Sequence, residues 1–72
     1  MQIDHHALQS ELQEIAGKIP VEVRLDKHIV IASSITETDK GFRIRLNPNR
    51  FHSPKKLEAH IQKCREVVSV YY

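Results

Sequence analysis

The sequence predicts an α+β fold in the order helix, three strands, helix, with a three-stranded antiparallel sheet and both helices packed on one face. Two patterns predict this class. Apolar residues recur every three or four positions near both ends of the chain, the period of a helix that buries one side. In the middle of the chain they alternate with polar residues, as in a strand buried on one side only.

The first helix is expected from about Asp4 to Ala16. Asp4 can cap its start by accepting hydrogen bonds from the free N–H groups of the first turn. Gly17 can adopt the left-handed conformation that closes a helix, and Pro20 prevents the helix from continuing. The residues predicted to line its buried stripe are Leu8, Leu12, Ile15 and Ile19.

Three strands are expected next, at residues 21–26, 28–36 and 42–46. The second is rich in β-branched residues, which favour extended structure. Asp39-Lys40-Gly41 is a turn signal, in which Gly41 is available for a positive φ. Two hairpin-like connections favour an antiparallel meander with its inner face covered by both helices.

The second helix is expected to begin after Asn47-Pro48-Asn49, which ends the last strand. Ser53 is a good N-cap, and Pro54 suits the first helical position. The last residues, 67–72, are β-branched and aromatic, so the helix can fray there or give way to an extended tail. The predicted buried stripe contains Leu57, Ile61, Cys64, Val68 and Tyr71.

Composition limits the class of protein. With 72 residues, 40% hydrophobic and 28% charged, the chain is long enough for one folded domain and too short for two. No signal peptide and no apolar run of about 20 residues is recognisable, so a membrane span is not expected. Cys64 is the only cysteine, which favours a reducing compartment, and we expect a cytoplasmic protein without a cofactor.

Residues 42–68 resemble a known scaffold. Two stretches carry the resemblance, Ile-Arg-Leu-Asn-Pro at 44–48 and Ser-Pro-Lys-Lys-Leu at 53–57. They are similar to the strand end and the helix start that precede the active-site helix in zincin-like metallopeptidases of the SprT and minimal gluzincin kind. The resemblance implies a His-Glu-x-x-His zinc motif two residues after Ile61. Residues 63–67 read Lys-Cys-Arg-Glu-Val instead, so the resemblance implies a zincin-like scaffold that is not a peptidase.

A shifted zinc site is the alternative to a domain without metal. His60 and Cys64 lie four residues apart and would share one edge of the second helix. Structural zinc takes four ligands, and no spacing in the sequence supplies the other two. The simpler interpretation places Cys64 in the core and the histidines at the surface or at its boundary with the core. The remaining ligands would have to be chosen from His5, His6, His28 and His52.

Basic residues gather around the start of the second helix, where free N–H groups and the helix dipole favour an anion. Nucleic acid or a phosphorylated partner would suit such a surface. The alternative is an ordinary solvated surface, balanced by Glu22, Glu37, Asp39 and Glu58. The residues of the predicted anion surface are Arg50, His52, Lys55 and Lys56, extended by Arg43 and Arg45 from the neighbouring strand.

Protein binding is the function that the sequence favours. No serine, histidine and acid set can be proposed from order or spacing, so we do not expect an enzyme. The apolar end of the chain exceeds what one helical face can bury, which indicates a homodimer or a larger protein partner, unless the end folds back over the sheet. The predicted interaction surface contains Val67, Val70, Tyr71 and Tyr72.

Overall fold

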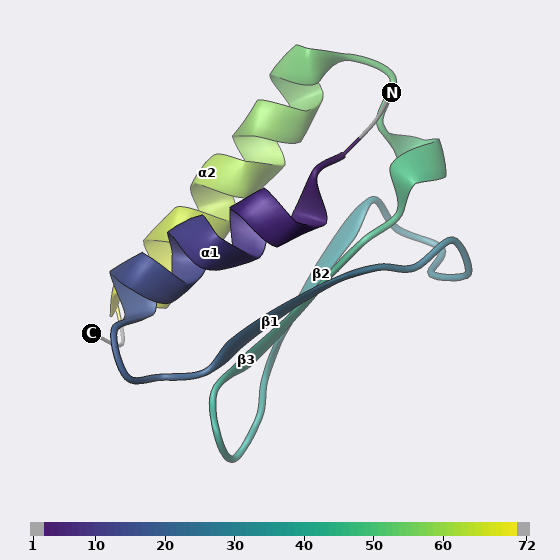
Figure 1. The fold of residues 1–72 in the computed structure, drawn as a ribbon. Coiled ribbons are helices and arrows are strands. Elements are labelled where there is room, and N and C mark those ends of the chain that lie inside the picture. The colour runs from purple at the N-terminus through teal and green to yellow at the C-terminus, as the bar shows by residue number, and fades with distance from the viewer. Residues whose placement is uncertain (1–2, 71–72) are drawn as a thin grey trace.

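The order of elements is the predicted one. The computed structural model describes residues 3–70, with two helices on one side of a three-stranded sheet (Figure 1). The predicted residues Tyr71 and Tyr72 lie outside this range. Within it, neither helix combines the length and the apolar character needed to cross a bilayer. The elements are α1 (His5–Ala16), β1 (Val21–Leu25), β2 (Ser33–Glu37), β3 (Phe42–Leu46), the short 3-10 helix η1 (Pro48–Arg50) and α2 (Pro54–Val70).

The sheet is mixed, so the predicted antiparallel meander is wrong. Its strand order is β1-β3-β2, with β3 parallel to β1 and antiparallel to β2. The hairpin between β2 and β3 is confirmed. Residues 26–32, by contrast, do not form a hairpin with β1. They carry the chain across the end of β3, so that β2 begins at Ser33 rather than near His28 and lies at the far edge of the sheet.

Asn47 holds this crossing segment in place. Its side chain is buried, and its Nδ2 donates to the carbonyl oxygens of Ile29 at 2.8 Å and Lys27 at 3.4 Å. Its backbone N–H donates to the carbonyl of Ala32 at 2.9 Å, and its Oδ1 accepts from the N–H of Asn49 at 3.0 Å. Because carbonyl groups of residues 27–29 are used in this way, the segment is a loop bound to the end of β3.

Gly41 is required for a reason other than the predicted positive φ. Among the glycines, Gly17 has a positive φ, of 66°, and Gly41 does not. A Cβ at Gly41 would lie 1.9 Å from the carbonyl oxygen of Pro20. This close approach exists because the next residue, Phe42, donates its N–H to the same oxygen and so starts the parallel pairing of β1 with β3.

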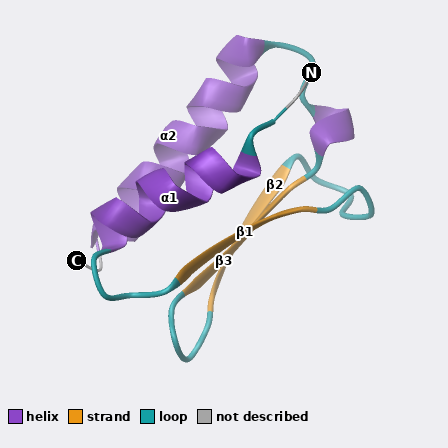
Figure 2. Ribbon diagram, in the orientation of Figure 1, coloured by secondary structure: helices purple, strands orange, loops and turns teal. Residues whose placement is uncertain are grey.

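Both helices begin as predicted, and α1 ends at Ala16 as predicted. The fraying or extended tail predicted from residue 67 is wrong for residues 67–70, because α2 stays helical to Val70, where Val68 is buried in the core. Asp4 accepts from the N–H of Ala7 at 3.0 Å, and Ser53 Oγ accepts from the N–H of Lys56 at 3.2 Å. Both helices cover the same face of the sheet (Figure 2). The core between them is built from the predicted stripes and from the inward residues of β1 and β3. Its fully buried large side chains are Leu12, Ile44, Leu46, Cys64 and Val68.

We expect Asn47→Ala to lower the free energy of unfolding by about 1 to 3 kcal/mol, because it leaves the part-buried N–H of Asn49 and the carbonyls of Lys27 and Ile29 without their partner. Urea denaturation followed by circular dichroism measures this loss. Asn49→Ala is the matched control, since the side chain of Asn49 is exposed. Equal stabilities of the two variants would show that Asn47 does not hold the crossing segment.

Candidate functional site

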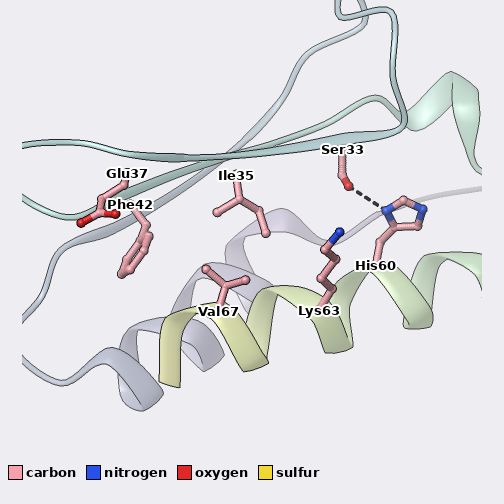
Figure 3. A pocket seen from close by; sticks show the side chains of 7 residues that line it. All are labelled: Ser33, Ile35, Glu37, Phe42, His60, Lys63 and Val67. Carbon is pink, nitrogen blue, oxygen red and sulfur yellow. Dashed lines mark hydrogen bonds between the residues drawn. The ribbon is translucent and has the colours of Figure 1, made fainter. Parts of the chain in front are cut away.

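A groove lies between β2 and α2 (Figure 3). Its volume is about 470 Å³. Alternate residues of β2 face the helices, and three residues of α2 at spacings of three and four lie on the helix side next to the buried stripe. The groove therefore forms where these two rows face each other. Its lining residues are Ser33, Ile35, Glu37 and Phe42 from the sheet and His60, Lys63 and Val67 from α2.

One end of the groove is closed by a polar contact. Ser33 Oγ and His60 Nδ1 share a hydrogen bond of 2.7 Å. The ring of Phe51 packs against the ring of His60 in an edge-to-face contact, with the centroids 5.1 Å apart. Lys63 extends its amine toward the same strand near this end, whereas Glu37 lies at the opposite end (Figure 3). The middle of the groove is apolar, and the two ends differ in charge.

The outer edge of β2 faces away from β3. Ala32 accepts from the N–H of Asn47, and Thr38 donates to the carbonyl of Gly41, so the even-numbered residues of this strand bond to β3. The N–H and C=O groups of Ser33, Ile35 and Glu37 point the other way. In the part of the chain that the structure describes, no strand pairs with that edge.

The outer edge of β1 is covered by side chains of α1. The outward N–H of Val21 donates to Gln13 Oε1 and that of Val23 to Gln9 Oε1, each at 2.9 Å. Gln13 Nε2 in turn donates to the carbonyl of Ile19 at 2.8 Å. The two edges of the sheet therefore differ. Side chains of α1 bond to the β1 edge, whereas the β2 edge pairs with no strand among residues 3–70 and lies beside the groove.

Ser33 and His60 are a serine and histidine pair that sequence order did not reveal. A nucleophilic serine needs a base that is itself oriented by a third group, usually a carboxylate. The described contacts of the His60 side chain are with Ser33 and Phe51, and no carboxylate of residues 3–70 pairs with it. In this geometry the pair serves to tie α2 to β2.

The positions implied for a zinc motif do not fit a zinc ion. Cys64 is fully buried, and this burial raises the pKa of its thiol, although zinc binds the thiolate. Arg65 donates to Glu11 at 2.5 Å and Glu58 at 2.7 Å, which raises the pKa of its guanidinium. Lys63 and Val67 line the groove. Among residues 3–70, no group of three or more histidines, cysteines or acids is placed to hold a metal.

The predicted anion surface is divided between two faces. Arg50, His52, Lys55 and Lys56 are exposed around η1 and the start of α2. Arg43 and Arg45 point to the opposite face of the sheet, because their neighbours in β3 are buried under the helices. There Glu22 pairs with Arg24 at 2.6 Å and lies 3.4 Å from Arg43.

Two residues of the predicted interaction surface, Val67 and Val70, lie within the described part of the chain. Val67 is half-buried and lines the groove, whereas Val70 is 78% exposed at the end of α2. Sequence patterns did not indicate that the other groove residues form one site. The helical spacing of His60, Lys63 and Val67 and the alternation of residues along β2 are visible in the sequence. Neither pattern shows that these two rows of side chains face each other.

Comparisons of the chain with models of protein families, with curated proteins and with solved structures gave no match. The resemblance to the zincin-like scaffold therefore stays a prediction.

We expect equimolar zinc to leave the thermal unfolding midpoint unchanged, because the buried thiol of Cys64 resists the deprotonation that zinc binding requires. Thermal unfolding with zinc, compared with magnesium as the control ion, measures this. A midpoint raised by zinc in the natural chain, but not in His60→Ala or Cys64→Ala, would establish the zinc site instead.

Proposed function

We propose that the chain is a non-catalytic protein-interaction domain that binds an extended segment of another polypeptide along the outer edge of β2. The observation that carries this proposal is the difference between the two edges of the sheet. Gln9 and Gln13 bond to the outward amides of β1, whereas the outward groups of β2 meet no strand among residues 3–70. Exposed edges promote unwanted pairing, and proteins usually protect them.

An added strand would gain affinity from backbone hydrogen bonds to Ser33, Ile35 and Glu37. It would gain specificity from the groove, because alternate side chains of the added strand would point toward α2. Ile35 and Val67 offer apolar contacts in the middle of the groove, and Lys63 and Glu37 offer opposite charges. A segment with alternating apolar residues suits this surface.

The same proposal accounts for the residues at the position of the absent zinc motif. On a zincin-like scaffold that is not a peptidase, Lys63 and Val67 would line a binding groove, while Cys64 completes the core. A buried free thiol also suits the cytoplasm, which we propose as the compartment.

We expect peptides selected from a displayed library of random extended sequences to bind the β2 edge. Glu37→Pro should weaken their binding at least about tenfold, because proline removes an outward N–H and its ring obstructs an incoming strand. The ladder to β3 does not use this N–H. Fluorescence anisotropy of a labelled peptide measures the affinity.

Glu37→Ala is the matched control, since it removes the carboxylate but keeps the N–H. A second pair, Ile35→Lys and Thr36→Lys, places the same side chain in the groove or on the opposite face of the sheet. Selected peptides that bind equally to Glu37→Pro and Glu37→Ala, or a library without binders, would contradict the proposal.

Anion binding on the open face of the sheet is the second candidate. This face carries Arg24, Arg43 and Arg45 against the single acid Glu22 on the three strands. Arg45 forms no ion pair with an acid of residues 3–70, and Ser34 lies opposite it in the antiparallel register. The strand residues here include no aromatic side chain, so phosphate contacts suit this face better than base stacking.

We expect duplex nucleic acid, if it binds this face, to bind more weakly as salt rises, because bound counterions are released. Arg45→Gln should then lower the affinity and reduce the salt slope by about one unit. Titration of a labelled duplex at several salt concentrations measures both. Lys56→Gln tests the predicted surface at the start of α2. An affinity that does not change with salt would exclude both surfaces.

A further inference from the structure

We infer that the segment bound at the β2 edge is β2 of a second copy of this chain, paired antiparallel about a two-fold axis at Ile35. This inference rests on the proposed function and names the partner. The two three-stranded sheets would join into one continuous sheet with all four helices on the same side.

The backbone of β2 is suited to pairing with itself. Its outward groups belong to Ser33, Ile35 and Glu37, so Ile35 is the central residue of the free edge. A two-fold axis at this residue pairs Ile35 with its own copy and Ser33 with Glu37 of the other copy. Each such pair exchanges both of its backbone hydrogen bonds in an antiparallel ladder. Every outward N–H and C=O of the strand would then have a partner.

The side chains in the groove are complementary under the same operation. Glu37 of one copy would lie opposite Ser33 of the other, at the groove end where His60 and the amine of Lys63 lie. The symmetry produces this acid-to-base contact twice, because a two-fold interface uses the same surface on both copies. The two Ile35 side chains would meet on the axis. Charge complementarity thus favours a second copy over an unrelated strand.

The helices leave room for this pairing. α1 lies at the β1 edge, since Gln9 and Gln13 reach the outward amides of that strand. α2 is joined to α1 through Arg65, which donates to Glu11. In residues 3–70, α2 meets β2 through side chains such as His60 and Ser33, and it makes no hydrogen bond to the outward backbone groups of β2. Burial of Ile35 and Val67 between two copies would also enlarge the small core of a 72-residue chain.

Sedimentation velocity over a wide concentration range tests the inference. We expect a dimer that dissociates on dilution, and a dissociation constant raised at least about tenfold by Glu37→Pro. Glu37→Lys and Lys63→Glu should each weaken the dimer, because like charges would then face each other twice. Lys56→Glu, on the exposed start of α2, should leave the dimer unchanged, and circular dichroism checks that every variant is folded.

Mixing the two charge variants makes the test specific for contact between copies. A Glu37→Lys chain paired with a Lys63→Glu chain restores opposite charges at both contacts, so native mass spectrometry should find mainly the mixed dimer. A single-chain mass at every concentration would overturn the second-copy inference, as would a dimer insensitive to Glu37→Pro. If selected peptides still bind the β2 edge in that case, the proposed function stands; if they do not, both fail.

Discussion

The topology depends on the hydrogen bonds that Asn47 makes at the end of β3. Its side chain and backbone donate to three carbonyl groups, those of Lys27, Ile29 and Ala32, in the segment between β1 and β2. With that segment held across the end of β3, β2 reaches the far edge of the sheet and β3 enters between the other two strands. The parallel pairing of β1 with β3 follows from this arrangement.

The same arrangement creates the site. Because β3 is central, β1 and β2 are both edges, but α1 covers only the first of them with glutamine side chains. β2 is left with outward backbone groups beside a groove whose far wall is α2. The β2 edge can therefore accept an added strand, whereas the glutamine side chains obstruct addition at the β1 edge. This difference between the two edges is the basis of the proposed binding function.

The segment with the zincin resemblance contains residues that have structural roles in this chain. Asn47 and Pro48 belong to the resembling segment, and in this chain Asn47 has a structural role that needs no metal. Cys64, at the position where a zinc motif is implied, is enclosed in the core. The segments that resemble a peptidase scaffold are thus explained here by local capping and by the anchoring of one loop.

The sequence by itself determined the class, the positions of both helices, their caps and the β2–β3 hairpin, because these depend on contacts between residues a few positions apart. Only the tertiary structure decided the strand order, the close approach that requires Gly41, and the meeting of Ser33 with His60. Alternating residues show which face of a strand is buried, but not which strand lies beside it. The groove and the free edge arise from that pairing, which is set by Asn47 and the covering of β1 by α1.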